Sequence, residues 1–516
     1  MNNNGKKFYI TTPIYYVNDK PHIGHAYTTI LADVIAGYHR LFGEDTFFLT
    51  GTDEHGQKVE EAAFKRGVSP DEHSDEYVKR FKQLWEKLSV RNDDFIRTVE
   101  PRHKRVVEAV LNDLYRKGDI YKGIYSGLYC TPCERFFMEK DLVKGLCPEC
   151  ERDVEAIKEE NYFFAMSKYR QWLIDYIDKN PCFIRPEFRR NETLGFLHKG
   201  LSDLCISRPK KRLSWGIELP FDPDYVCYVW FDALINYISA IGYKSDDRRF
   251  RYLWGADYHL IGKDILTTHT VYWPTMLRAI GIEQPGTIFA HGWWLMDGGK
   301  ISKSKGNAVD PLSLLDKYGA DAFRYFLMAD MSLGQDAAFS EKRFVARYNS
   351  DLANNLGNLV NRIIRLIDSC CKGIVPGVRN DNPYDKKLRD EIIEIAGAVE
   401  NDVAGLRIDI AVTNILKGCS LINQYLENTE PWKLKKNRMG KERLGDILGN
   451  STEALRIVSG LLYPVIPEKI VKLGEWLGFT GDEKIPTFGN LKNWGGLLKG
   501  KKVKTGKVLF PRIEQY

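Results

Sequence analysis

The 516-residue sequence predicts an α/β protein with a parallel sheet in its first part and only helices beyond about residue 345. Strand-like and helix-like stretches alternate with short connections near the start and again from about residue 223, an order typical of a parallel sheet. Between residues 119 and 222, short Tyr- and Gly-rich stretches surround several cysteines. This segment is therefore expected to be an insertion that divides the α/β part.

The first α/β unit is predicted from residues 7–53. KFYITTPIYY is rich in β-branched and aromatic residues, which favours a strand. Residues 23–41 follow helical spacing and are expected to bury one face, formed by Ile30, Leu31, Val34, Ile35, Tyr38 and Leu41. GEDTFFLTGTDEHG then predicts a turn, a second strand and a polar loop, and residues 57–118 are predicted to be helical.

The later elements follow the same reasoning. YLWGADYHLIGKDILTTHTVYWPTML repeats strand and helix, and TIFAHGWWLMDGGKISKS adds a strand with a tight turn at Asp297-Gly298-Gly299. Helical spacing dominates after about residue 345, and Pro431 is expected to end one of these helices. The expected division is 1–118 and 223–290 for the two halves of the α/β domain, 119–222 for the insertion, 291–345 for a lysine-rich loop region and 346–516 for a helical domain.

Composition favours a soluble globular protein, since 43% of the residues are hydrophobic and 28% are charged. No apolar run approaches the roughly 20 residues needed to cross a bilayer. The start, MNNNGKKFYI, lacks the apolar segment of a signal peptide, so a cytoplasmic location is expected. The net charge of +6 permits nucleic-acid binding without requiring it, and KGKKVKTGK is either a solvated surface segment or an RNA contact.

Four of the ten cysteines form a compact pattern. Cys130, Cys133, Cys147 and Cys150 follow the spacing C-x₂-C-x₁₃-C-x₂-C. Four thiolates at such spacing suit tetrahedral Zn²⁺, and a closed four-cysteine site is usually structural. The sequence therefore predicts one structural zinc ion in the insertion, in a protein from a reducing compartment.

His22 and His25 flank Gly24 in KPHIGHAY, where the first helix is expected to begin. Ligands of parallel sheets bind beyond the carboxyl ends of the strands, and a helix N-terminus favours an anion. Gly24 lacks a β-carbon that would block a flat group, and the two imidazoles supply hydrogen-bond donors for phosphate oxygens. The alternative is that His22 caps the helix and His25 is an ordinary half-buried imidazole.

A second motif, GGKISKSKGN, places Lys300, Lys303 and Lys305 on a glycine-flanked loop. Several ammonium groups on such a loop suit a polyphosphate. Alone, the segment is equally consistent with a solvated basic loop.

Together the two motifs resemble the signature motifs of class I aminoacyl-tRNA synthetases, and nearly the whole chain is similar to the methionyl-tRNA synthetases among them. Ile301 stands where many members have Met. The resemblance implies a Rossmann-like catalytic domain split by the zinc-containing insertion and followed by a helical-bundle anticodon-binding domain. It also implies a methionine–tRNA ligase that forms methionyl-adenylate from methionine and ATP, releases pyrophosphate, and charges tRNA(Met) for initiation and elongation.

The resemblance also implies the roles of individual residues. The catalytic residues would be His22, His25, Lys300 and Lys303, acting with Mg²⁺. ATP would be bound by these four with Gly24 and Asp264, although Asp264 is equally well explained as a helix N-cap. Methionine would contact Ile14, Tyr16, Asp53, Trp230, Ala233, Leu234, Tyr237, Ile265, His269 and Trp273.

Asp53 also follows the second predicted strand directly, a place suited to a substrate ammonium, although a loop-turn aspartate is the alternative. The two tryptophans, as bare residues, would be ordinary core. The CAU anticodon would be read by Asn358, Arg362 and Trp432, for which a polar helix surface and a core tryptophan are the alternatives. The other implied contact is the tRNA acceptor end. A monomer is expected, because the sequence up to Tyr516 shows no C-terminal dimerisation module.

Three other functions are consistent with parts of the sequence. Another class I synthetase would share both motifs, although the enzymes for leucine, isoleucine and valine carry a large editing insertion. A stand-alone nucleotidyltransferase that adenylates a small acid would leave the long helical part without a role. A zinc-ribbon RNA-binding protein without catalysis would leave the lysine-rich loop unexplained.

Overall fold

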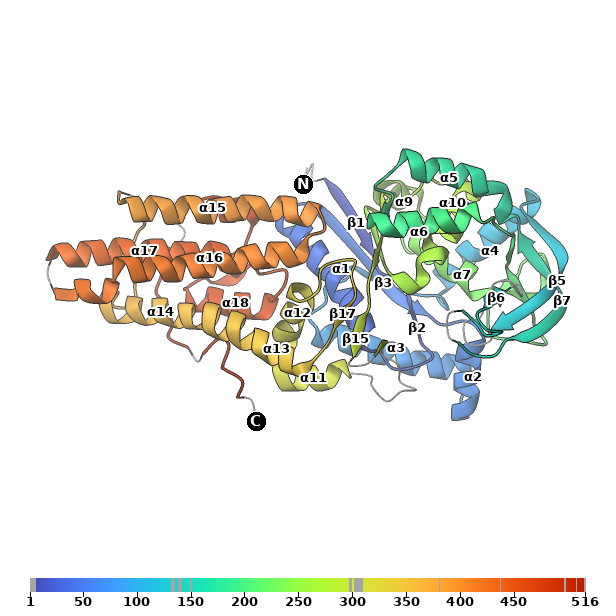
Figure 1. Ribbon diagram of the computed structural model, residues 1–516, viewed down its shortest axis with the longest axis horizontal. Coiled ribbons are helices and arrows are strands. Elements are labelled where there is room, and N and C mark those ends of the chain that lie inside the picture. Colours follow the sequence, from blue (N-terminus) through green and yellow to red (C-terminus); the bar gives the residue numbers. More distant parts are fainter. Residues whose placement is uncertain are drawn as a thin grey trace.

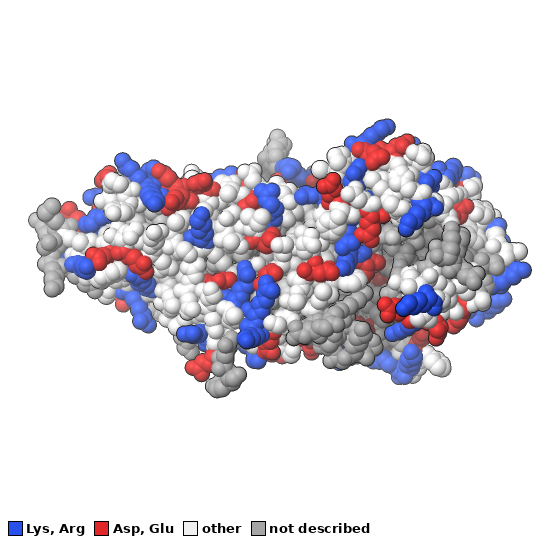
Figure 2. Space-filling view, in the orientation of Figure 1, with Lys and Arg blue, Asp and Glu red and all other residues white. Residues whose placement is uncertain are grey.

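The computed structural model describes residues 6–130, 135–137, 142–148, 151–296, 299–300, 310–379, 381–436, 438–495, 498–506 and 508–514. Figure 1 shows an elongated molecule in which a sheet-containing half is followed by a helical half. Within the described ranges, no helix is both long and apolar enough to span a membrane. Lys and Arg are interspersed with Asp and Glu over the visible face (Figure 2), which agrees with the modest net charge.

A seven-stranded sheet forms the centre of the first half. Its strands are β1 (Lys7–Thr11), β2 (Tyr15–Tyr16), β3 (Asp45–Asp53), β4 (Asp94–Arg97), β8 (Ile184–Arg185), β13 (Tyr258–Gly262) and β14 (Thr287–His291). The order is β2-β3-β1-β13-β14-β8, β4 also pairs with β3, and every pair is parallel. The predicted parallel sheet is confirmed.

Helix α1 (Ile23–Leu41) has the predicted bounds, but its burial differs from the expectation. All of its residues except Gly24, His25 and Arg40 are buried, not one face alone. The reason is that α1 packs on β1, β3 and β13 and also contacts α12 (Ala320–Ala329) in the helical half. A helix covered on nearly every side can be apolar all round.

The prediction that residues 57–118 are helical is only partly correct. Three helices form, namely α2 (Gln57–Arg66), α3 (Pro70–Lys87) and α4 (Pro101–Arg116). Between α3 and α4, however, β4 extends the central sheet beside β3. Four residues are too few to reveal a strand period in the sequence.

Two smaller sheets follow within residues 119–227. The first contains β5 (Ile120–Cys130), β6 (Arg135–Phe137), β7 (Glu155–Phe164) and β9 (Leu204–Cys205), all antiparallel. The second contains β10 (Ser207–Pro209), β11 (Glu218–Leu219) and β12 (Asp222–Cys227). The same region holds α5 (Arg170–Lys179) and α6 (Glu187–His198), and between them β8 returns to the central sheet beside β14.

The α/β pattern then resumes as predicted. The elements are α7 (Val229–Leu234), α8 (Asn236–Ser239), α9 (Asp247–Leu253), η4 (Lys263–Ile265), η5 (Thr268–Tyr272) and α10 (Trp273–Ile280). Beyond β14, β15 (Trp294–Met296) pairs with β16 (Gly299–Lys300) and with β17 (Ala337–Ala338). Met296 pairs with Gly299, as a tight turn requires, while Asp297 and Gly298 themselves lie outside the described residues.

The helical half begins with α11 (Pro311–Tyr318) and α12. It continues with α13 (Glu341–Arg347), η7 (Tyr348–Gly357), α14 (Asn358–Cys371), α15 (Pro383–Ala404), α16 (Ile408–Thr429), η8 (Pro431–Lys436), α17 (Arg438–Leu461), α18 (Pro467–Trp476), η9 (Gly481–Lys484) and α19 (Phe488–Lys492). Helices α15, α16 and α17 lie side by side (Figure 1). Helix α16 ends just before Pro431, as predicted.

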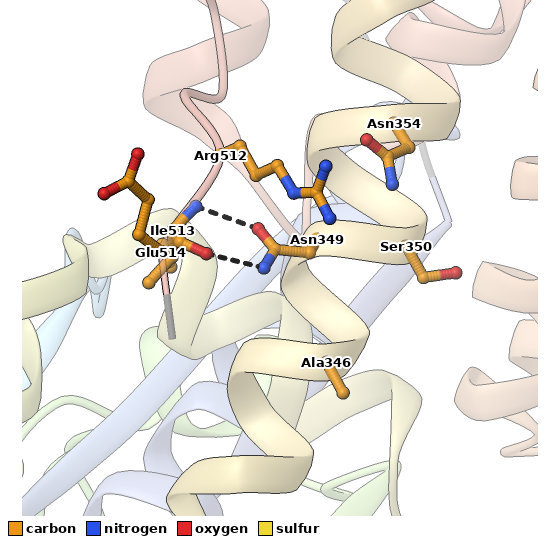
Figure 3. Close-up of a pocket in the computed structure, with 7 residues that line it drawn as sticks. All are labelled: Ala346, Asn349, Ser350, Asn354, Arg512, Ile513 and Glu514. Atoms are coloured by element: carbon orange, nitrogen blue, oxygen red, sulfur yellow. Dashed lines mark hydrogen bonds between the residues drawn. The ribbon is translucent and has the colours of Figure 1, made fainter. Parts of the chain in front are cut away.

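The C-terminal segment packs back onto η7. The Asn349 side chain donates to the carbonyl of Ile513 at 2.8 Å and accepts from its N–H at 2.9 Å (Figure 3). The Tyr348 hydroxyl donates to the carbonyl of Pro511 at 2.9 Å. These bonds fix one wall of an open cavity of about 830 Å³.

The two halves are joined through Arg324 of α12, which is fully buried. Its guanidinium donates to Asp33 Oδ2 of α1 at 2.7 Å, to the carbonyls of Pro464 and Val465 at 2.7 and 2.9 Å, and to that of Leu88 at 3.1 Å. One continuous hydrophobic cluster also runs from α1 into the helical bundle. The bundle is thus docked directly on the helix that begins at His22.

Candidate active site

The first helix begins with two stacked imidazoles. His22 is the N-cap of α1 and His25 is its third residue, with ring centroids 3.8 Å apart and planes inclined by 21°. The N–H of Gly24 donates to Nδ1 of His22 at 3.1 Å, and the N–H of His22 donates to Nδ1 of His25 at 3.2 Å. His22 therefore caps the helix, as the alternative interpretation expected.

Capping also decides which ring nitrogen can donate. Because Nδ1 of each ring accepts a backbone N–H, a neutral ring carries its hydrogen on Nε2. Gly24 allows this arrangement, since a β-carbon there would lie 2.9 Å from Cε1 of His22. Two Nε2–H donors at a helix N-terminus form a suitable site for a phosphate group.

The end of β14 lies beside the second turn of α1. Thr28 Oγ1 is 2.8 Å from Nε2 of His291, the last residue of β14. At Gly292, a β-carbon would lie 2.1 Å from the carbonyl oxygen of Gln335, so the segment before β17 approaches the same place closely. Three distant parts of the sequence thus meet near the start of α1.

Asp264 follows β13 at the same edge of the sheet and is held by Trp293. The Trp293 indole N–H donates to Asp264 Oδ1 at 3.0 Å. Asp336 accepts the backbone N–H of Trp293 at 2.8 Å and pairs with the Lys263 ammonium at 2.6 Å. The N-cap interpretation of Asp264 is wrong, because Gly262 is the N-cap of η4.

The positions expected to bind methionine come from neighbouring elements. Asp53 is the last residue of β3, is buried, and pairs in register with Tyr16 of β2. Ile14 precedes β2 and lies against Gly51 of β3. The remaining positions lie on α7, α8, η4, η5 and α10, and they are Trp230, Ala233, Leu234, Tyr237, Ile265, His269 and Trp273.

Several of these side chains contact one another directly. The Tyr237 hydroxyl is 2.8 Å from Nε2 of His269, whose Nδ1 is 3.0 Å from the Ile265 carbonyl. Because a carbonyl only accepts, Nδ1 of His269 donates and Nε2 accepts from Tyr237. Burial lowers the pKa of His269 to about 4 and raises that of Tyr237, so both groups are neutral at pH 7. Trp273, fully buried, lies 5.7 Å from the Tyr237 ring and closes this uncharged wall.

The positions expected to contact an anticodon lie together in the helical half. Asn358 begins α14 and is exposed, and Arg362 lies one turn further along the same helix. The Arg362 guanidinium is 5.0 Å from the ring centroid of Trp432, which is 42% exposed at the start of η8. The interpretation of Trp432 as a core residue is therefore wrong.

Comparison with known proteins agrees with this geometry. A family model described as tRNA synthetases class I (M) matches residues 8–157 and 152–364. A methionine–tRNA ligase of Clostridium perfringens is 47% identical over 511 residues, which cover 99% of this chain and 78% of that protein. One of Thermotoga maritima is 46% identical, with 98% and 80% covered. The chain belongs to the methionine–tRNA ligases. It is thus an aminoacyl-tRNA ligase of class I.

A solved methionyl-tRNA synthetase of Mycobacterium tuberculosis, in complex with methionyl-adenylate, has the same fold. Its TM-score is 0.94 at 38% identity, and the match covers 98% of this chain and 100% of that chain. The free-state structure of the M. tuberculosis protein matches with a TM-score of 0.87. The fold is therefore that of a methionine–tRNA ligase over nearly its whole length.

Two of the four predicted cysteine ligands are described. Cys130 ends β5 and Cys147 follows a hairpin in which Val143 bridges Leu146, and both thiols are buried. Cys133 and Cys150 lie outside the described residues. Among the residues that the structure describes, no group of three or more potential metal ligands occurs.

The lysine-rich loop of this ligase is described only at its start. Lys300 lies in β16, which pairs with β15. Strand β15 begins two residues after Gly292. Lys303 and the rest of the motif after Lys300, residues 301–307, lie outside the described residues. The expected role of these residues in binding ATP therefore rests on the family resemblance and on the position at which β16 ends.

Some residues of this ligase site were missed by sequence reasoning. Buried His259 of β13 accepts the Trp273 indole N–H at 3.3 Å and lies 2.7 Å from Thr11 Oγ1. Trp293 holds Asp264, and Asp336 in turn holds the Trp293 backbone and the Lys263 ammonium. The aromatic pair in HGWW was a usable signal for Trp293, whereas Asp336 has no motif of its own.

Proposed function

We propose that the protein activates methionine with ATP at the carboxyl edge of its parallel sheet and then transfers the methionyl group to the 3′ end of tRNA(Met). The observation that carries this proposal is the capped pair of imidazoles, His22 and His25, with both Nε2–H donors defined at the edge that also holds Asp53 and Asp264. A helix N-terminus with two added donors fits a triphosphate.

The first step joins the carboxylate of methionine to the α-phosphorus of ATP. An oxygen–phosphorus bond forms while the bond to pyrophosphate breaks, and pyrophosphate keeps that electron pair. The attacking carboxylate is already ionised, so no general base is needed, and rate enhancement comes from positioning and charge stabilisation. His22 and His25 donate to phosphate oxygens, while Lys300 and Lys303 stabilise the departing pyrophosphate. Mg²⁺, when bound with ATP, supplies further positive charge.

The second step attaches the methionyl group to tRNA. The terminal ribose 2′-hydroxyl attacks the carbonyl carbon of the adenylate, an ester bond forms, its proton is released, and AMP leaves with the electron pair. We assign Asp264 to the ribose hydroxyls of ATP and the backbone at Gly24 to a close approach of the nucleotide.

We assign methionine recognition to the Asp53 carboxylate and to an uncharged aromatic wall. Asp53 accepts the substrate ammonium. The neutral pair of Tyr237 and His269, with Trp273 behind it, presents polarisable aromatic surface to the thioether. Such a wall distinguishes one methylene by only about 1–3 kcal/mol. We therefore expect partial activation of close isosteres of methionine.

The cysteine cluster fits a structural zinc ion. The donor set is four thiols at a spacing typical of zinc, and the described pair, Cys130 and Cys147, is buried. Lys144 and Gly145, with φ of 56° and 79°, form the tight turn that leads to Cys147. Zinc, when bound, supplies a cross-link within the insertion. Because such thiols require reducing conditions, the cytoplasm is the proposed compartment.

The helical domain, residues 346–516, is assigned to anticodon recognition. Trp432 stacks on a splayed base of the CAU anticodon, and Asn358 and Arg362 hydrogen-bond to base edges. The support is that an exposed indole, a guanidinium and an amide lie together on α14 and η8. The proposed division of the remaining chain keeps 1–118 and 223–290 as catalytic halves, 119–222 as the insertion, and 291–345 as the loop and stem-contact region.

The proposal is tested by ATP–pyrophosphate exchange with a panel of amino acids. Methionine is expected to drive exchange better than leucine, isoleucine, valine or cysteine, because its long polarisable thioether makes the more favourable contacts with the aromatic wall. Exchange driven by leucine or cysteine, with none from methionine, would show that the pocket assignment is wrong.

A further inference from the structure

Asp232, in the middle of α7, is the centre of a buried cluster with His55 and His103. None of these three residues has been given a role above. Asp232 Oδ2 is 2.7 Å from Nδ1 of His55, and Asp232 Oδ1 is 2.7 Å from Nε2 of His103. Nδ1 of His103 is in turn 2.8 Å from Ser239 Oγ. All four residues are buried.

The protonation of this cluster follows from its surroundings. Burial acts to raise the pKa of Asp232, but the charges and hydrogen bonds of His55 and His103 outweigh it and lower the pKa to about 2. Asp232 is therefore a carboxylate at neutral pH and only accepts hydrogen bonds. The facing nitrogens of both imidazoles must then carry hydrogens. A buried carboxylate that lost one of these donors would be costly, so the three side chains hold one arrangement.

The cluster connects the two walls of the proposed methionine pocket. His55 comes two residues after Asp53, which ends β3. Asp232 lies on α7 between Trp230 and Ala233. The Asp232 carboxylate thus links the ammonium-binding side of the pocket to its aromatic side. Its partner His55 is distant from it in the sequence.

The two residues that follow Asp53 are both held by buried hydrogen bonds. Glu54 is buried, accepts two bonds from the Arg97 guanidinium at 2.8 and 2.7 Å, and accepts one from Thr52 Oγ1 at 2.6 Å. On the next residue, His55 is fixed by Asp232. Because Glu54 and His55 are both fixed directly after Asp53, the direction in which the backbone leaves Asp53, and hence the direction of its carboxylate, depends on these bonds.

We propose that Asp232, acting through His55 and His103, is a positioning residue for methionine recognition. It fixes the distance between the Asp53 carboxylate and the wall formed by α7, which a bound α-ammonium and its side chain must span together. Its loss weakens methionine binding selectively, since the phosphate-binding end of α1 is held by separate bonds. This inference rests on the proposed role of Asp53.

The test compares variants in methionine-dependent ATP–pyrophosphate exchange. Asp232→Asn keeps the shape but removes the charge, and is expected to raise KM for methionine at least tenfold while KM for ATP stays within twofold. His55→Leu should raise KM for methionine in the same way, because it also removes the hydrogen bond between His55 and Asp232. His55→Asn should recover most of the loss, because its amide N–H lies near the position of Nδ1. This conservative pair keeps the proposal testable if Asp232→Asn fails to fold.

A matched control separates positioning from general stability. Asp385 of α15 is buried and paired with Arg443 of α17 at 2.6 Å, far along the sequence from the site. Asp385→Asn should lower the midpoint of thermal unfolding without changing KM for methionine.

Three results would overturn the inference. These are an unchanged KM for methionine in Asp232→Asn, equal increases of both KM values, and no recovery in His55→Asn. Asp53→Asn distinguishes the underlying assignment. If Asp53→Asn leaves KM for methionine unchanged, the proposed pocket fails; if it raises KM while Asp232→Asn does not, the pocket stands and the positioning role fails.

Discussion

The carboxyl edge of the sheet and the surface of the helical half use tryptophan in opposite ways. Trp273 is fully buried, donates its indole N–H to His259 and lies against Tyr237. Trp432 is 42% exposed, with the Arg362 guanidinium over its ring. A small substrate is taken out of water by fixed walls, whereas an RNA base covers an exposed ring itself. Under the proposed assignments, burial rather than residue type distinguishes the substrate pocket from the RNA contact.

The contact between the two regions is tested by removing the side chain that joins them. Arg324→Ala removes the guanidinium that pairs with buried Asp33 of α1, and removal of one partner of such a pair typically costs about 3–5 kcal/mol. We expect that loss in the free energy of unfolding, measured by urea denaturation. The double change Asp33→Leu with Arg324→Met should recover part of it. Stability equal to the wild type in Arg324→Ala would show that the two regions do not depend on this contact.

The chemistry of the first region is tested by Lys303→Ala. Loss of one donor that stabilises developing charge typically slows a reaction by about 10²–10³-fold. We expect that decrease in single-turnover adenylate formation, with an unchanged circular dichroism spectrum. Lys305→Ala, in the same loop, is the control and should have a much smaller effect. A near-normal rate in Lys303→Ala would remove its assigned role.

The second region is tested by Trp432→Ala. Base–aromatic stacking contributes about 1–3 kcal/mol, so kcat/KM for tRNA(Met) should fall roughly 5- to 150-fold. Adenylate formation should remain within twofold of the wild type, because Trp432 lies in the helical half. Trp432→Phe keeps an aromatic face and should retain most of the activity. Unchanged charging of tRNA by Trp432→Ala would reject the anticodon assignment.

The smallest expected effect concerns the pH dependence of stability. Burial lowers the pKa of His269 to about 4, whereas an unfolded histidine titrates near 6.5. As pH falls below about 6.5 the unfolded chain takes up a proton that the folded protein does not, so stability decreases until about pH 4. His269 alone accounts for about 0.7 kcal/mol between pH 7 and 6.

Urea denaturation of wild type and His269→Gln checks this slope. The stability difference between the two proteins should shrink as pH is lowered, because the variant has no such proton to exclude. A difference that grows or stays constant between pH 7 and 5 would contradict the neutral state of His269.

The sequence revealed local features better than distant contacts. The bounds of α1 and the end of α16 before Pro431 were predictable, because capping residues and proline act within one turn. The short strands β4 and β8 were not, since two to four residues carry no measurable period. Their places in the sheet are decided by neighbouring strands.

The site shows the same division. The pair His22 and His25 was visible in the sequence because they lie three positions apart, and their mutual capping is a local interaction. Asp232, in contrast, meets His55 across 177 positions of sequence, and Trp293 meets Asp264 across 29. The sequence around Asp232 does not indicate that His55 is its partner, and the sequence around Trp293 does not indicate Asp264. Contacts of this kind require the folded sheet to bring the segments together.

A crystal structure with methionine and a non-hydrolysable ATP analogue would show whether the imidazole pair and the lysine-rich loop act on one nucleotide. We predict that Nε2 of His22 and of His25 lie about 3 Å from oxygens of the same triphosphate that the ammonium of Lys303 contacts. A structure in which the lysine-rich loop and the two histidines face separate cavities, with the triphosphate in contact with only one of them, would show that the two motifs do not share one nucleotide.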